Sequence, residues 1–321
     1  MKHTVFAASR RFSNLSLLSK IRLVICGLGL AISTIILLIF LIYYRYSSGE
    51  QALSSAKNAA RTAAGTFQVN YNNILEQFVF VCGTRQFASG LESLVNSSSD
   101  AKRLLQTELS SLAHCNYLVH SAMILSGDGE RSCTLYTNSL QKPPKDLFSS
   151  QELAEVQGIT FLPRRPSPLR SSISVMPLLF PLSLTMDEYA QLTDKNSSPE
   201  GYIIIFLDCG KLEESLLLNG SERADGSYYL MDAQNRALNA DPQKHLPHIL
   251  TQENTSQFLT SLRNSSQGEG TLRLPGAWLI AIKISGTDLI LLNYVPRISL
   301  LDALGTAGAS LLLIFLVVLA I

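Results

Sequence analysis

Two uncharged apolar runs near the ends of the chain constrain its fold more than any other feature. They are Leu23–Tyr44 and Ala303–Ile321, and neither contains an acidic or basic residue. A helix as long as the shorter run rises about 28 Å, close to the thickness of the hydrocarbon core of a bilayer. We therefore predict transmembrane helices at 23–44 and 303–321, a short segment at 1–22, and one large domain at 45–302 between the two spans.

The charges before the first run predict its orientation. Residues 1–22 carry Lys2, Arg10, Arg11, Lys20 and Arg22 and no acidic residue. By the positive-inside rule this segment stays in the cytoplasm, so 45–302 lies outside. The run is long for a signal peptide, and no Ala-x-Ala site follows it directly, which favours an uncleaved anchor. We expect a multi-pass protein of the bacterial inner membrane, in contact with lipid, whose large domain is periplasmic.

Hydrophobic periodicity predicts an α+β domain. Apolar residues recur every three or four positions over 46–81, so one long helix is expected to continue out of the first span, and a second helix over 100–114. Residues 138–172 indicate a surface excursion. The remaining pattern indicates hairpins around one antiparallel sheet. The predicted strands are 117–125, 131–137, 173–180, 201–208, 227–232, 236–239, 271–274, 277–284 and 288–295, with a short helix at 211–218. Small-residue spacings in the spans favour a homodimer through the transmembrane and long helices.

This order of elements resembles an extracytoplasmic PAS-like (Cache-type) sensor module. The dipeptide Cys133-Thr134, with Cys82 upstream at the end of the long helix, narrows the resemblance. The order of elements and the two cysteines together resemble the CSS-motif sensor domains of membrane-bound cyclic-di-GMP phosphodiesterases. In that family a cytoplasmic EAL domain follows the second span. Thr134-Leu135 replaces the usual Ser-Ser, and the sequence holds no EAL domain.

The resemblance implies a disulfide between Cys82 and Cys133. Closing a loop of about 52 residues would stabilise the domain by roughly 4 kcal/mol in the chain-entropy model. The bond could be a switch that shifts the long helix or a static staple, and Cys115 is a rival partner for either cysteine. Cys209 is expected to be a buried free thiol or to form a pair of its own. Periplasmic thiol-disulfide oxidoreductases are then possible partners of the domain.

Other sites are less well marked. Several residues on or beside strands are candidates for a ligand pocket of the Cache type: Tyr202, Tyr228, Tyr229, Asp232 and Arg236. Asp232–Asn235 is also typical of a plain turn. No nucleophile motif, phosphate-binding loop or convergent set of metal ligands is present, so we predict no catalytic residue, metal or cofactor. The net charge of +1 predicts no nucleic-acid partner.

These patterns predict a membrane-anchored signal-sensing protein whose periplasmic domain responds to redox state or a small ligand. By resemblance it is the sensory half of a cyclic-di-GMP phosphodiesterase without its catalytic domain. One alternative is a full hydrolase whose EAL domain is truncated or encoded separately, so whether the protein is an enzyme stays open. A second is a glycosylated surface protein, because several Asn residues begin Asn-x-Ser/Thr triplets.

Overall fold

The structure is a computed structural model with two compact units, Ser55–Pro296 and a second unit made of Met1–Ser54 and Arg297–Ile321. All of the described strands belong to Ser55–Pro296. The residues that the structure describes are 16–85, 87, 90, 99–126, 135–136, 147–156, 158–184, 190–192, 201–218, 227–241, 250 and 252–296.

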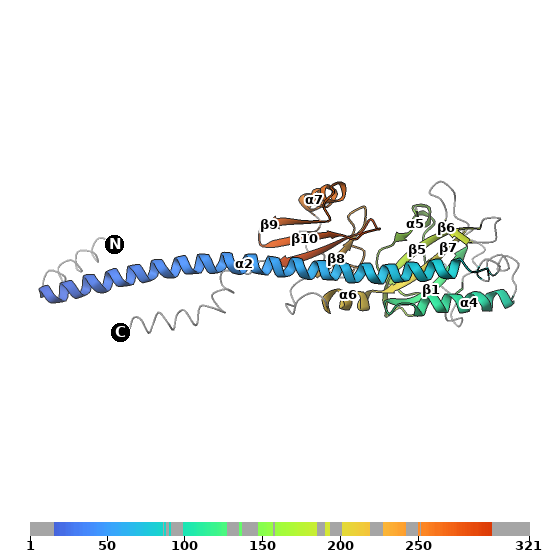
Figure 1. Ribbon diagram of the computed structural model, residues 1–321, viewed down its shortest axis with the longest axis horizontal. Coiled ribbons are helices and arrows are strands. Elements are labelled where there is room, and N and C mark those ends of the chain that lie inside the picture. The colour runs from blue at the N-terminus through green and yellow to red at the C-terminus, as the bar shows by residue number, and fades with distance from the viewer. Residues whose placement is uncertain are drawn as a thin grey trace. The chain divides into compact units, whose positions relative to one another are not determined.

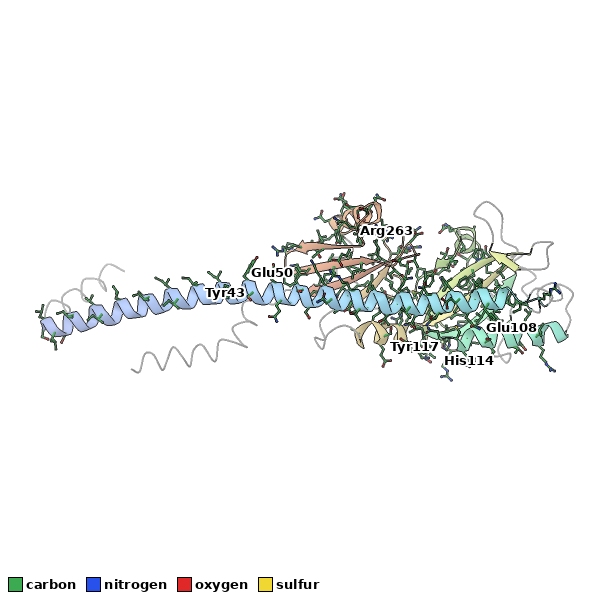
Figure 2. The ribbon with its side chains drawn as sticks, in the orientation of Figure 1. Tyr43, Glu50, Glu108, His114, Tyr117 and Arg263 are labelled. Atoms are coloured by element: carbon green, nitrogen blue, oxygen red, sulfur yellow. The ribbon has the colours of Figure 1, made fainter. Side chains whose placement is uncertain are left out.

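Helix α2, Leu17–Cys82, confirms the expected long helix and includes the first apolar run (Figure 1). No proline interrupts it. Its large apolar side chains that are described between Leu17 and Tyr46 are 50% to 77% exposed, among them Tyr43 (Figure 2). Counting only the residues that the structure describes, no helix is long and apolar enough to cross a membrane. The second predicted span, 303–321, lies outside those residues, and both spans stay predictions.

The larger sheet has seven described strands, all antiparallel to their partners, in the order β2-β1-β7-β5-β3, with β4 and β6 also paired to β5. Its centre is β7, an uninterrupted apolar run that is buried between β1 and β5. The strands are β1 (Val119–Ser126), β2 (Leu135–Tyr136), β3 (Thr160–Phe161), β4 (Arg165–Pro166), β5 (Ser174–Leu184), β6 (Ala190–Leu192) and β7 (Gly201–Asp208).

Helix α2 packs on one face of this sheet. Its residues Phe67, Ile74 and Phe78 are buried, at the spacing of one helix face. The ring of Phe78 stacks on that of Phe180 in β5, with 4.0 Å between the centroids. Phe180 is paired in register with Ile203 of β7, so α2 contacts the middle of the sheet. Helix α4 (Ser99–His114) contacts β1 and β2.

The described strands after α6 form a second sheet of four, so the expectation of one sheet is wrong. Its antiparallel order is β8-β11-β10-β9. Helix α6 (Cys209–Leu218) links the sheets and contacts β5, β7 and β8. Helix α7 (Glu253–Asn264), which the pattern did not predict, covers one face of the second sheet with Leu259 and Leu262. The strands are β8 (Ser227–Met231), β9 (Glu269–Leu274), β10 (Ala277–Lys283) and β11 (Ile290–Pro296).

The predicted surface excursion at 138–172 is partly wrong, because its described part is built into the domain. It contains α5 (Ser150–Ala154), β3 and β4. Phe161 and Leu162 of this segment are buried, and the ring of Phe161 lies against Tyr71 of α2. The described part of this segment, 147–156 and 158–172, is therefore an irregular but packed connection.

Candidate functional site

The face of the larger sheet away from α2 holds an apolar cluster. We call residues 147–156, which include α5, the cover, because they lie over this face. Tyr202, Ile204 and Phe206 point toward the cover, since alternate side chains of a strand share a face. Further members of the cluster come from β1, β5 and the cover itself: Met123, Leu125, Val175, Leu179, Leu147, Phe148, Leu153 and Val156.

Polar contacts fix the cover to the sheet. Ser149 and Glu152 form a capping box at the start of α5. Arg165 of β4 donates to Glu152 Oε1 at 2.7 Å and to the carbonyl of Leu147 at 2.9 Å. Its guanidinium also lies 4.8 Å from the centroid of the Phe148 ring. The cover is therefore attached by side-chain contacts, both apolar and polar, rather than by strand pairing.

Two ionisable groups report this attachment. Partial burial opposes ionisation of Glu152, but hydrogen bonds from Arg165 and Ser149 outweigh it and hold the pKa of the carboxyl below its usual value. Tyr202 donates its hydroxyl to the carbonyl of Leu153 at 3.1 Å, and burial raises the pKa of this phenol. Both groups therefore keep their usual protonation states at neutral pH.

The cover face of the larger sheet also holds a buried hydroxyl that has no hydrogen-bond partner in the described part of the chain. Ser121 of β1 is fully buried, and its Oγ has no hydrogen-bond partner among the described residues. Ser121 is paired in register with Phe206, so its side chain lies on the cover face. The ladder shifts register between Val119 and Ser121.

His120, the residue at this shift, bonds to Ser167 Oγ through Nε2 at 3.0 Å. Burial, opposed by nearby Asp208, lowers the pKa of its imidazole. Ser167 itself is buried and also accepts from the backbone N–H of Leu169. This histidine–serine pair is a structural contact, since the buried hydroxyl is already engaged twice.

The five predicted pocket residues do not come together. Tyr202 lies under the cover, whereas Tyr228 and Tyr229 are in β8 of the second sheet. Asp232 and Arg236 form the turn after β8, where Asp232 accepts from the backbone N–H groups of Gln234 and Arg236 and pairs with Arg236 Nε at 2.7 Å. The alternative interpretation of this segment as a turn is confirmed. A ligand role for these residues stays a prediction.

The cysteines are only partly described. Cys82 ends α2 and is a buried free thiol, and burial raises its pKa to about 12. Cys209 begins α6 and is also a buried free thiol, with burial raising its pKa to about 12. Cys115 is half-buried and free. Cys133 lies outside the described residues, so the Cys82–Cys133 bond and its Cys115 rival stay predictions. No group of three His, Cys, Asp or Glu among the described residues could hold a metal ion.

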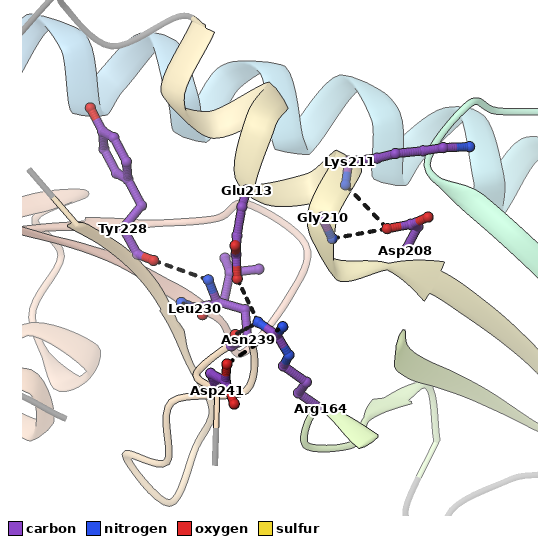
Figure 3. Close-up of polar contacts among 9 residues, drawn as sticks. All are labelled: Arg164, Asp208, Gly210, Lys211, Glu213, Tyr228, Leu230, Asn239 and Asp241. Carbon is purple, nitrogen blue, oxygen red and sulfur yellow. Dashed lines mark hydrogen bonds and ion pairs between the residues drawn. The ribbon is translucent and has the colours of Figure 1, made fainter. Parts of the chain in front are cut away.

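A second polar cluster, at Arg164, joins the two sheets (Figure 3). The backbone N–H of Arg164 donates to the carbonyl of Leu238 at 2.7 Å. Its guanidinium donates to Glu213 Oε1 of α6 at 2.6 Å and to the carbonyl of Asn239 at 3.3 Å. Asp241 lies 4.0 Å from the same guanidinium. Sequence reasoning missed this cluster, Arg165 and Ser121, although the dipeptide Arg164-Arg165 between prolines was a visible signal.

Comparisons with known proteins give similarity of fold alone. No family model matches the chain, and a search of curated proteins gives no match. A domain of a sensory box/GGDEF family protein from Vibrio parahaemolyticus is 18% identical with a TM-score of 0.46, covering 78% of this chain and 98% of that one. The extracellular domain of histidine kinase rpHK1S-Z16 is 12% identical with a TM-score of 0.49, covering 77% and 95%.

The sensory domain of the Campylobacter jejuni chemoreceptor Tlp3, solved with isoleucine bound, is also similar. It is 11% identical with a TM-score of 0.44, covering 79% of this chain and 96% of that one. All three are sensory or extracellular domains of signalling proteins.

Proposed function

We propose that this chain is the sensory part of a signalling protein and binds a small ligand between the cover and the larger sheet. The Ser121 hydroxyl carries this proposal, because it is buried on the cover face of the sheet and has no hydrogen-bond partner among the described residues. Burying such a group costs about 1–3 kcal/mol. A ligand that bonds to it would recover that cost. The apolar surroundings favour a ligand with an apolar body and one hydrogen-bonding group.

The position of the cover suggests how binding would be signalled. The cover is attached through side-chain contacts that a ligand can replace, chiefly those of Arg165 with Glu152 and Leu147. The strands beneath it pack on α2 with their opposite face, where Phe78 stacks on Phe180. A ligand that moves these strands therefore changes the packing of α2, and this helix is the proposed signal element.

Thermal unfolding of the full-length chain in detergent micelles tests the ligand site. The probes are amino acids, short carboxylic acids and sugars, each at millimolar concentration. We expect one class to raise the Tm of the wild type, to lose that effect in Ser121→Ala, and to keep it in the control Tyr228→Phe. If Tyr228→Phe abolishes the shift while Ser121→Ala keeps it, the ligand sits on the second sheet; if no class shifts the Tm, the proposal is wrong.

We also propose that both apolar runs are anchors in a bacterial inner membrane, with 45–302 in the periplasm. The exposed apolar side chains of α2 between Leu17 and Tyr46 support this, since lipid would cover them. Alkaline-phosphatase fusions at residue 150 should be active and fusions at 321 inactive. An inactive fusion at 150 would contradict the proposed orientation.

The resemblance carried by Cys133-Thr134 leads to a more specific proposal about the enzyme that the domain controls. We propose that the domain controls an EAL-type cyclic-di-GMP phosphodiesterase and that a Cys82–Cys133 disulfide, maintained by thiol-disulfide oxidoreductases, restrains it. A buried thiol with a pKa of about 12 is a poor nucleophile, so Cys82 would depend on an enzyme for oxidation. Peptide mapping of oxidised protein should link Cys82 to Cys133; a link from Cys115 to Cys133 would refute the pairing. An EAL reading frame in the downstream DNA would support the output.

Finally, we propose a homodimer through α2. On the face of α2 that turns away from the sheets, Val69, Val79 and Phe80 are 59%, 61% and 69% exposed. A second copy in the same membrane would present the same helix in parallel, and such a stripe is self-complementary about a two-fold axis. Phe80→Glu should convert a dimer to a monomer in analytical ultracentrifugation. The control Thr260→Glu, which adds the same charge at an exposed position of α7, should stay dimeric if the apolar stripe of α2 makes the contact.

A further inference from the structure

Two adjacent arginines hold different parts of the domain. Arg165 binds the cover through Glu152 and the carbonyl of Leu147. Arg164 binds α6 and the segment after β8 through Glu213 and the carbonyl of Asn239. The two side chains are similarly buried, with 15% and 17% of their surface exposed, and their ion pairs are equally short, at 2.6 and 2.7 Å. One peptide bond therefore joins the cover to the second sheet.

We propose that Arg164-Arg165 is a mechanical relay through which displacement of the cover alters strand β8 of the second sheet. The inference rests on the proposed function, because it names the route by which a ligand at the cover would act. The relay would be a second route for the signal, in addition to α2. Strand β8 pairs with β11, the last described strand before the predicted second span.

Asn239 is the receiving residue of this relay. Its side chain is buried. Strand β8 lies at the edge of the second sheet, and the Asn239 amide makes hydrogen bonds to its backbone as a neighbouring strand would. The amide Oδ1 accepts from the backbone N–H of Leu230 at 2.8 Å, and Nδ2 donates to the carbonyl of Tyr228 at 3.0 Å. Figure 3 shows Arg164 and β8 on either side of Asn239. A shift of the guanidinium therefore acts on two hydrogen bonds of β8.

The guanidinium of Arg164 suits such a role because its contacts are incomplete. Its Nε is buried and has no hydrogen-bond partner among the described residues. The guanidinium has five N–H donors in a rigid planar fork, so it cannot improve one contact without changing the others. A lysine could keep the charge opposite Glu213, but it is one bond shorter and lacks the planar fork that fixes the contacts relative to one another.

Hydrogen exchange of the full-length chain in detergent micelles tests the relay without any ligand. Glu152→Gln weakens the hold of Arg165 on the cover, and the reporter is the amide of Leu230. We expect Glu152→Gln to speed exchange of this amide about five-fold, as for loss of one ordinary hydrogen bond. In an Arg164→Gln or Arg164→Lys background, Glu152→Gln should have no further effect on it.

Arg61→Gln is the matched control background. Arg61 also contacts the second sheet through a glutamate, binding Glu269 of β9 with two bonds of 2.6 Å, but it comes from α2 rather than from the cover. The effect of Glu152→Gln on Leu230 should persist there.

Two results would overturn the relay. The first is an unchanged Leu230 amide in Glu152→Gln when the amides of α5 exchange faster. The second is an effect of Glu152→Gln that survives undiminished in the Arg164 variants. If Arg164→Gln does not fold, the same comparison of Leu230 exchange is made in Arg164→Lys. Failure of the ligand screen would leave these exchange results unaffected, so the two proposals can fail separately.

Discussion

The two sheets are each covered by a helix, but the two helices are held in different ways. Helix α7 inserts Leu259 and Leu262 into the apolar cluster of the second sheet. The cover of the larger sheet contains one short helix. Its Leu147, Phe148 and Leu153 are only partly buried against the sheet, and Arg165 and Tyr202 add hydrogen bonds. Burial of leucine is worth more than an exchangeable hydrogen bond. We therefore expect the cover of the larger sheet to be displaced more easily than α7.

The ends of the two helices show the same difference. At the end of α7, the ammonium of Lys283 donates to the carbonyls of Arg263 and Ser265 at 3.1 and 2.6 Å, which compensates the negative end of the helix dipole. In addition, Gly270 of β9 lies close under Phe258, because a Cβ there would come within 3.0 Å of the ring. Before α5, Phe148 stacks on Phe206 with 6.4 Å between the ring centroids, but Phe148 is only partly buried. The proposed ligand site requires a cover of this kind.

The largest expected effect is that of Leu259→Ala. It removes a fully buried side chain from under α7 and should destabilise the domain by about 2–5 kcal/mol. Thr260→Ala, at the exposed neighbouring position, is the control and should change little. Urea unfolding followed by circular dichroism measures both. If Leu259→Ala costs no more than substitutions in the cover, the proposed difference between the two helices is wrong.

A smaller effect separates two buried serines of the larger sheet. Ser167→Ala removes a hydroxyl that bonds to His120 and Leu169, and should cost about 1 kcal/mol or more. Ser121→Ala removes a hydroxyl without a described partner and should leave the stability of the ligand-free protein unchanged or slightly raised. Urea midpoints of the two variants measure the difference. A clear loss of stability in Ser121→Ala would indicate a partner within the chain rather than a site for a ligand.

The sequence predicted the helices and strands whose buried side chains recur at a regular spacing. The uninterrupted apolar run of β7 and the three-to-four spacing of α2 locate both elements to within a few residues. Helix α7 was missed because its apolar face is confined to Phe258, Leu259 and Leu262 in an otherwise polar segment, and Gln252 before it makes no side-chain cap bond. The second sheet was missed for another reason, since strand patterns do not say which strands pair.

The candidate site was harder to predict than the fold. Of the predicted pocket residues, only Tyr202 lies under the cover, because the aromatic residues of β7 and β8 belong to different sheets. Ser121 carries no signal in the sequence: it is one small polar residue within an apolar strand, and only the register with Phe206 assigns it a face. Arg164 and Arg165 are adjacent, yet they bind different regions, and this follows from tertiary contacts alone.

The smallest expected effect is the response of the cover to acid. The pKa of Glu152 is lower in the folded protein than in the unfolded chain, so its ion pair stabilises the cover at neutral pH. This contribution is complete above the unfolded pKa of about 4.3 and is lost as the pH falls through the lower folded value. Because the Glu152 side chain is 36% exposed, screening limits the gain to less than about 1 kcal/mol. Hydrogen exchange of the α5 amides, corrected for the intrinsic pH dependence of exchange, should therefore show weaker protection near pH 3.5 than near pH 6. Glu152→Gln should abolish the difference, whereas the amides of α7 should keep their protection over the same range. Equal loss of protection in both helices would mean that acid loosens the whole domain and not the movable cover.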